Sequence, residues 1–95
     1  MFESLNSVAR RYDEIGQLMA DTAVATDYGQ VARPAKERSE IETLVITYRS
    51  YRSAQQQLTD AELLADDGDD LELAAMAREE ALHLEAEISS LEHAL

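Results

Sequence analysis

The stretch LLADDGDDLELAAM, Leu63 to Met76, places four aspartates around one glycine, between two segments of helical pattern. Such an acidic stretch is either a calcium loop or the turn between two helices. In an EF-hand loop, glycine occupies position six and oxygen ligands occupy positions one, three and twelve. With Gly68 at position six, those three positions fall on Leu63, Ala65 and Ala74, whose side chains carry no oxygen. The pattern therefore argues against calcium and favours a turn.

The residues of this stretch each have a role in a helix–turn–helix connection. Gly68 suits the left-handed conformation that commonly ends a helix. Asp69 is expected to cap the following helix, with Glu72 three residues later completing a capping-box-like pair. Asp69, Asp70 and Glu72 also lie at the positive end of that helix dipole. The sequence predicts a turn at 67–69.

Apolar residues recur every three or four positions in three segments, as expected for helices that pack along one face. The first segment carries Leu5, Val8, Tyr12, Ile15 and Met19. The second carries Ile41, Leu44, Val45, Tyr48, Tyr51, Leu58, Ala61 and Ala65. Gln55 falls inside or beside this stripe, so we expect it either at the edge or with a hydrogen-bonding partner. The third carries Leu73, Ala77, Leu84, Ile88, Leu91 and Leu95, flanked by Met76 and Ala81.

The predicted fold is all-α: an elongated antiparallel three-helix bundle, formed by a coiled-coil-like hairpin of two long helices and a shorter N-terminal helix. We expect a helix at about 1–20, a loop or short helix at 21–32, a long helix at about 33–66 and a helix at about 70–95. The long helix is expected to begin near Arg33, because Pro34 fits only a first turn. Ninety-five residues are typical of a single domain.

The net charge of −12 is unevenly distributed along the chain. Seven basic residues stand against eight acidic ones up to Ser53, whereas Arg78 alone stands against twelve acids from Ala54 onward. Such a chain repels free DNA, and its partners should be basic or apolar. The absence of cysteine fits a reducing cytoplasm, and no segment is typical of a signal peptide or a membrane span.

The sequence contains no pattern typical of a catalytic, cofactor or metal site. His83 and His93 lie about 15 Å apart along a helix, too far to share a metal. Glu80 and His83 form one Glu-x-x-His pair, but a di-iron site needs such pairs from several helices. Serine-nucleophile and phosphate-loop motifs are absent. We therefore predict no enzyme activity and no cofactor for this chain.

The segment YRSYRS, residues 48–53, is a basic and aromatic cluster, a composition that also suits contact with RNA. Tyr48 and Tyr51 fall on the apolar stripe, so we expect their rings in the core and their hydroxyls at its rim. Arg49 and Arg52 project elsewhere, to pair with acids or to bind a phosphate. Together with Asp69 and Asp70, they are the candidate partner-binding residues.

Three segments in order resemble the N-terminal domain of the bacterial class I peptide chain release factors. These are VARRYDEIGQLMAD (8–21), KERSEIETLVITYRSYRSA (36–54) and ELLADDGDDLELAAMAREE (62–80). The lack of tryptophan places the chain nearer the release factor 1 branch than its sister branch. The resemblance implies a longer translation termination factor that directs peptide release at UAA and UAG stop codons. It also implies that this domain contacts the stalk base of the large ribosomal subunit and responds to the GTPase release factor.

The family's hydrolysis motif, Gly-Gly-Gln, is missing from this chain. Gly16-Gln17 and Gly29-Gln30 each have a single glycine. We therefore expect an N-terminal fragment of a longer factor, located in the cytoplasm and without catalysis of its own. The alternative is a structural or adaptor module that self-associates as a coiled-coil homodimer through an exposed apolar tail at Leu91 and Leu95.

Overall fold

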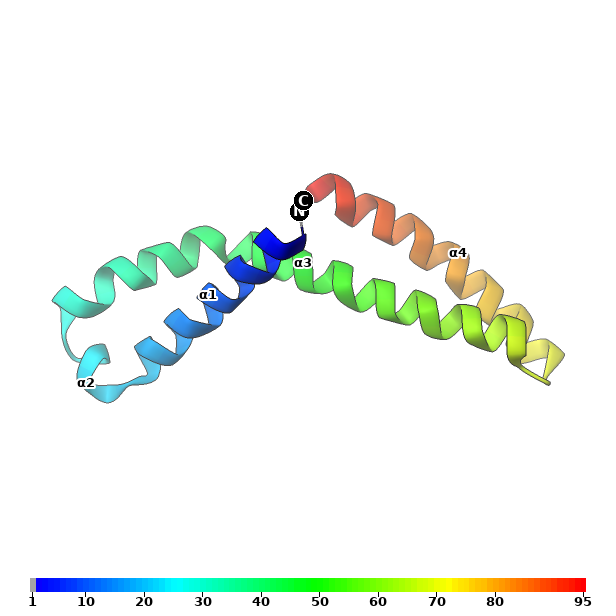
Figure 1. Cartoon of the computed structure of the whole chain (residues 1–95), viewed down its shortest axis with the longest axis horizontal. Coiled ribbons are helices and arrows are strands. Elements are labelled where there is room, and N and C mark those ends of the chain that lie inside the picture. Colours follow the sequence, from blue (N-terminus) through cyan, green and yellow to red (C-terminus); the bar gives the residue numbers. More distant parts are fainter. Residues whose placement is uncertain (1) are drawn as a thin grey trace. The chain divides into compact units, whose positions relative to one another are not determined.

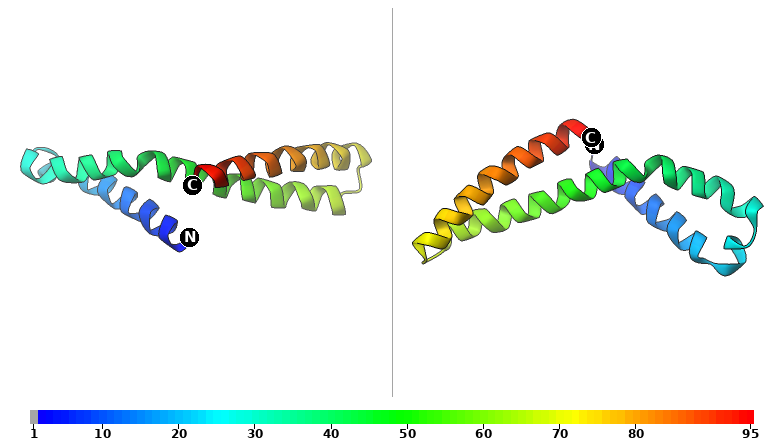
Figure 2. Two further views of the ribbon diagram at one scale, coloured as in Figure 1. Left: turned by 90° about the horizontal axis from the view of Figure 1, so that it is seen from above. Right: turned by 180° about the vertical axis from the view of Figure 1, so that it is seen from behind.

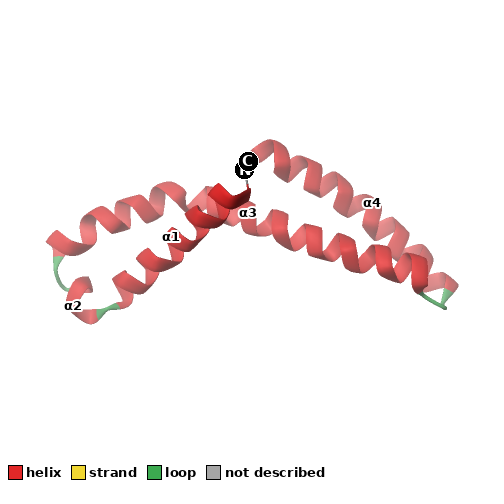
Figure 3. Ribbon diagram, viewed as in Figure 1, coloured by secondary structure: helices red, strands yellow, loops and turns green. Residues whose placement is uncertain are grey.

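The computed structural model describes residues 2–95, and in that range the chain is helical with short connections (Figure 1). The helices are α1 (Phe2–Ala20), α2 (Thr22–Ala25), α3 (Tyr28–Asp67) and α4 (Leu71–Ala94). Residues 2–95 contain no strand (Figure 3), so the predicted all-α class is confirmed. The predicted start of the first helix at residue 1 lies outside the described residues.

The chain forms two compact units, Met1–Ile46 and Thr47–Leu95. In the first unit, α1 and α2 precede the first part of α3, and α1 packs against that part of α3 (Figure 1). In the second unit, α4 runs antiparallel beside the second part of α3, as the two further views also show (Figure 2). The predicted hairpin of two long helices is thus confirmed. That residues 1–95 form a single domain stays a prediction.

The long helix begins earlier than predicted: α3 starts at Tyr28 rather than near Arg33. The Asp27 carboxylate accepts hydrogen bonds from the Gly29 backbone N–H (3.0 Å) and from Gln30 Nε2 (2.7 Å). An aspartate that satisfies the free N–H groups of a first turn stabilises a helix start at this point. Pro34 therefore lies inside α3, where it removes one hydrogen bond without ending the helix.

The cap of α4 also differs by one residue from the prediction. Asp70, not Asp69, is the N-cap, and its carboxylate accepts from the backbone N–H groups of Glu72 (2.9 Å) and Leu73 (3.2 Å). Gly68 does not adopt a positive φ. It is instead required by close approach, because a Cβ at this position would lie 2.5 Å from the Leu64 carbonyl oxygen.

The core of the first unit forms between α1 and the first part of α3. Leu5, Tyr12 and Ile15 of α1 are buried, together with Val45 of α3, and Ile15 is fully inaccessible. The remaining members of the predicted α1 stripe, Val8 and Met19, are half-buried. The predicted stripe of the N-terminal helix is therefore confirmed.

Polar contacts surround this core on the α1 side. The Arg11 guanidinium donates two hydrogen bonds to the Glu37 carboxylate, at 3.0 and 2.8 Å. This bidentate contact lowers the pKa of Glu37 and raises that of Arg11, mainly through the hydrogen bonds themselves. Both side chains are about half exposed, so the pair orients α1 on α3 more than it stabilises the contact.

Gly16 provides the space for Arg38 of α3 to cross α1. The Arg38 guanidinium carbon lies 3.8 Å from the centroid of the Tyr12 ring, and Arg38 Nε donates to the Tyr12 carbonyl at 3.2 Å. A Cβ on Gly16 would lie 3.1 Å from Arg38 Nη2. The glycine thus allows a cation–π contact at the edge of the core.

We expect Gly16→Ala to have opposite effects on the helix and on this contact. Alanine adds about 1 kcal/mol of helix propensity, but its methyl group displaces Arg38 from Tyr12, which loses about 0.5–1 kcal/mol. Gly16→Ala should therefore leave the unfolding free energy nearly unchanged in the natural chain and raise it by about 1 kcal/mol in an Arg38→Ala background. Urea unfolding of the four proteins measures the difference. An equal gain in unfolding free energy in both backgrounds would show that an alanine at position 16 does not disturb the contact of Arg38 with Tyr12.

The core of the second unit is built mostly from small residues. Ala54, Ala61 and Leu84 are buried together, and half-buried apolar side chains pack against them, namely Leu58, Ala81, Ile88 and Leu91. On α4 the buried face begins at Ala74 and Ala77. Leu73 and Met76, predicted on or beside this stripe, are exposed. The correct stripe runs 74, 77, 81, 84, 88, 91 and 95, which keeps the alternation of three and four without a break.

The tyrosines of the basic and aromatic cluster lie where the sequence predicts them. Tyr48 and Tyr51 are buried. Tyr51 Oη donates to the Glu92 carboxylate at 3.1 Å and accepts from Gln55 Nε2 at 2.9 Å, so of the two cases expected for Gln55 the structure shows the one with a hydrogen-bonding partner. Burial and the neighbouring Glu92 together raise the pKa of Tyr51. The hydroxyl thus joins α3 to the last turn of α4.

Candidate functional site

The connection between α3 and α4, which we call the hairpin tip and define as residues 63–76, carries five acidic residues within the seven positions 66–72. Asp66, Asp67, Asp69 and Glu72 are exposed there. Asp70 is also exposed, but its carboxylate caps α4 and is partly committed to that role. The tip is thus an acidic surface that is held in place by its own helix start.

The basic residue nearest the hairpin tip, Arg78, bonds to a backbone carbonyl of α3. Arg78 Nη2 donates to the backbone carbonyl of Ala65 at 3.3 Å. Ala65 lies in the last turn of α3, where carbonyls have no partner within the helix. Arg78 therefore closes the C-terminal end of α3 from the facing helix, and it is one cation among the five acidic side chains of the tip.

The two predicted pairs of site residues are not brought together. Arg49 and Arg52 are exposed on α3, at the end of the second unit opposite the hairpin tip. Fifteen residues separate Arg52 from the end of α3, which corresponds to about 22 Å along the helix. Asp69 and Asp70 lie at the tip itself. The second unit thus presents an arginine pair and an acidic tip as separate surfaces.

Sequence reasoning missed a set of exposed apolar side chains at the hairpin tip. Leu63, Leu64, Leu71, Leu73 and Met76 are all exposed. The helical register of α4 could have indicated them. When the buried stripe is placed on Ala74 and Ala77, three of these residues fall outside the stripe, namely Leu71, Leu73 and Met76. Ala74 was overlooked as a core residue because its neighbour Leu73 is more hydrophobic.

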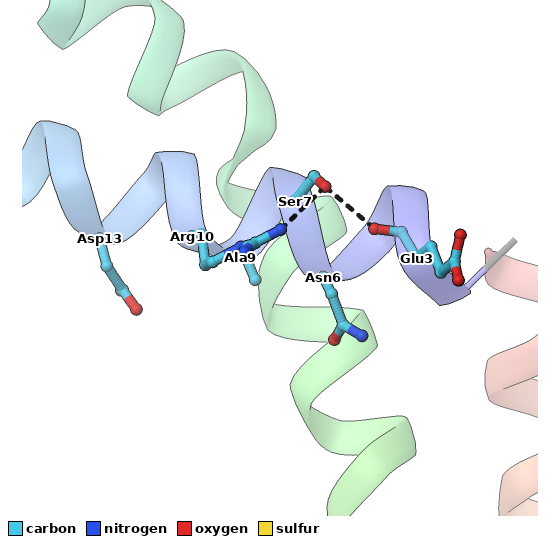
Figure 4. Close-up of a pocket in the computed structure, with 6 residues that line it drawn as sticks. All are labelled: Glu3, Asn6, Ser7, Ala9, Arg10 and Asp13. Carbon is cyan, nitrogen blue, oxygen red and sulfur yellow. Dashed lines mark hydrogen bonds between the residues drawn. The ribbon is translucent and has the colours of Figure 1, made fainter.

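The surface hollows of the molecule are open and shallow. One, of about 640 Å³, is lined by Glu3, Asn6, Ser7, Ala9, Arg10 and Asp13, all from α1 (Figure 4). Within it Arg10 Nη2 donates to Ser7 Oγ at 3.2 Å, and Ser7 Oγ donates to the Glu3 carbonyl at 3.1 Å. The charged groups of this hollow are exposed, so they lack the desolvation that acid–base catalysis requires.

A second hollow, of about 340 Å³, lies between α3 and α4. It is lined by Glu62, Ala65, Asp66, Arg78, Ala81, Leu82 and Glu85. Among residues 2–95, no group of three histidine or carboxylate side chains is arranged to hold a metal ion. In the same range, none of the helices has an apolar stretch long enough to cross a bilayer.

These features define a class: a helical hairpin protein whose exposed, charged ends are the surfaces available for binding. Comparison with known proteins identifies the family within this class. The PCRF domain family matches residues 8–95, and the chain belongs to this family. The resemblance to the N-terminal region of peptide chain release factors is thereby confirmed.

The curated relatives are peptide chain release factor 1 proteins. The chain is 33% identical to that of Bacillus thuringiensis subsp. konkukian over its whole length, and it covers 27% of that protein. It is 35% identical over 91 residues to the protein of Bacillus licheniformis, of which it covers 26%. Identity to the Staphylococcus aureus protein is 32% over 95 residues. The chain thus spans about a quarter of the length of these relatives. No solved structure matches it.

Proposed function

We propose that this chain is the N-terminal helical part of a translation termination factor of the release factor 1 type, acting at the ribosome in the cytoplasm. The observation that carries the proposal is the PCRF family match over residues 8–95, together with 32–35% identity to release factor 1 proteins. In this proposal the full-length factor directs peptide release at UAA and UAG codons. The chain itself contributes binding and no catalysis.

Within the factor, we assign the second unit a docking role at the stalk base of the large ribosomal subunit, together with a response to the GTPase release factor. Its charge supports this assignment, because the second unit contains twelve acidic residues and only three basic ones, Arg49, Arg52 and Arg78. A surface of this sign is attracted to basic ribosomal protein and is repelled by exposed rRNA phosphates. Asp69 and Asp70 at the hairpin tip are the proposed contact residues, and Arg49 and Arg52 form a second candidate surface.

Pull-down of the stalk-base protein with its rRNA fragment tests this docking. We expect binding that weakens as salt rises, and a further loss in the double variant Asp69→Asn, Asp70→Asn. Asparagine is as good an N-cap as aspartate, so the variant removes two charges while keeping the helix start. Glu3→Gln with Glu40→Gln removes the same charge from the first unit and should bind normally. The absence of salt-sensitive binding by the natural chain would overturn the assignment.

Self-association as a homodimer is the alternative function. It was based on an apolar tail at Leu91 and Leu95, and the structure weakens that basis, because Leu91 packs against the core of the second unit and both side chains are half-buried. Sedimentation at several concentrations separates the two functions. A monomer at all concentrations supports the docking role, and a stable dimer supports the coiled-coil module.

A further inference from the structure

The hairpin tip places its large apolar side chains outward and its small ones inward. Ala61, Ala65, Ala74 and Ala77 are buried between α3 and α4. Their larger neighbours in the chain are exposed, to 56% for Leu63, 45% for Leu64, 84% for Leu71, 47% for Leu73 and 65% for Met76. We call these five residues the apolar tip. Folding of the second unit gains little from them, since burial of a leucine stabilises only when water is removed from it.

The five residues of the apolar tip lie close to one another along the helices. Leu63 is four residues from the end of α3, and Met76 is five residues from the start of α4. At 1.5 Å per residue, all five therefore lie within about 8 Å of a helix end at the same turn. Exposed leucine and methionine side chains that gather at one end of a helical hairpin are typical of an interaction surface, and methionine adapts well to a partner's shape.

The charges around the apolar tip restrict the kind of partner. Asp66, Asp67, Asp69 and Glu72 surround it and are exposed, while Arg78 points its guanidinium at the Ala65 carbonyl. Nucleic acid is disfavoured, because its binding depends on cations that neutralise phosphates. A second copy of this chain would bring the same carboxylates together at the contact. A protein surface with basic side chains around an apolar recess is complementary to the apolar side chains of the tip and to the carboxylates around them.

We propose that the apolar tip inserts into an apolar recess of a basic protein surface, with the acidic side chains of the tip pairing with the cations at the rim of that recess. This inference rests on the proposed function, because it specifies the kind of contact that the docking end of the second unit makes. The apolar side chains provide the affinity that persists in salt, and the carboxylates accelerate association and set the orientation.

Co-sedimentation of the full chain with purified large ribosomal subunits, and separately with the protein-free rRNA extracted from them, tests the inference. The variant Leu71→Gln, Met76→Gln removes the two most exposed apolar side chains of the tip, so its folding should be little affected, as thermal melting will verify. Leu82→Gln is the matched control, since Leu82 is 67% exposed on α4 but lies outside the tip. We expect the tip variant to bind subunits about tenfold more weakly, the control to bind normally and naked rRNA not to be retained.

Normal binding of the tip variant to subunits, or equal retention by naked rRNA, would overturn the inference while leaving the ribosomal role intact. If the natural chain does not bind subunits at all, the ribosomal docking role fails instead. The tip is then tested with a synthetic amphipathic helix of lysine and leucine, against a control peptide in which serine replaces leucine. The inference is supported if binding is lost both when serine replaces the leucines of the peptide and when Leu71 and Met76 of the chain are replaced. It is overturned if binding survives one of these two changes.

Discussion

Replacing Ile15 with alanine should lower the unfolding free energy of the first unit by about 3 kcal/mol. Ile15 is the one described side chain with 0% exposure, and it lies in a core that also contains Leu5, Tyr12 and Val45. A cavity at this position cannot be filled by solvent, and little other apolar material is available to collapse into it. Because 1.4 kcal/mol corresponds to a factor of ten, amide protection in α1 should fall by about two orders of magnitude.

Hydrogen exchange followed by mass spectrometry measures this effect helix by helix. Leu18→Ala is the matched control in α1, because Leu18 is 39% exposed and its truncation should cost less than about 1 kcal/mol. The core of the second unit consists of different residues, centred on Ala54, Ala61 and Leu84. Amides of α4 in Ile15→Ala should therefore keep most of their protection. Equal loss of protection in α1 and α4 would show that the two cores unfold as one.

The sequence was sufficient for most of the fold because the helical period is unambiguous wherever large apolar residues define it. Leu5, Tyr12 and Ile15 repeat at seven and three residues, and all three are buried as predicted. Tyr48 and Tyr51 were assigned to the core from their register, although a basic and aromatic cluster also suits RNA contact. Gln55 was expected either at the edge of the stripe or with a hydrogen-bonding partner, and the structure shows that it donates to the Tyr51 hydroxyl.

The errors arose where local chemistry competes with a simple rule. Pro34 suggested a helix start near Arg33, but α3 begins five residues earlier, at Tyr28, where the Asp27 carboxylate binds the Gly29 N–H of the first turn. In α4, Leu73 was placed on the stripe instead of Ala74, because hydrophobicity was ranked above regular spacing. Both errors concern a residue whose role depends on its neighbours in space rather than on its own type.

The candidate site was only partly accessible from the sequence. Charge counting identified Asp69 and Asp70, since acidic residues accumulate visibly around Gly68. The apolar tip could not be found in that way, because a leucine near a helix end is equally compatible with core and surface. Its recognition needed the packing of α3 against α4, in which alanines occupy the interior. Which surfaces bind a partner is a property of that packing and of the partner.

Gly68→Ala should destabilise the second unit by about 2 kcal/mol, the cost of forcing an atom into occupied space. The new Cβ would lie 2.5 Å from the carbonyl oxygen of Leu64, which is a backbone atom and cannot rotate away, so the last turn of α3 must shift. That shift also disturbs the hydrogen bond from the Gly68 N–H to the same carbonyl.

Gly29→Ala is the matched control, because its nearest neighbour is a side-chain oxygen of Asp27 at 3.3 Å, and it should change stability by less than about 0.5 kcal/mol. Urea unfolding followed by circular dichroism compares the two variants. Equal stabilities would mean that the turn has room for a side chain at position 68 and that close approach to the Leu64 carbonyl does not require glycine there.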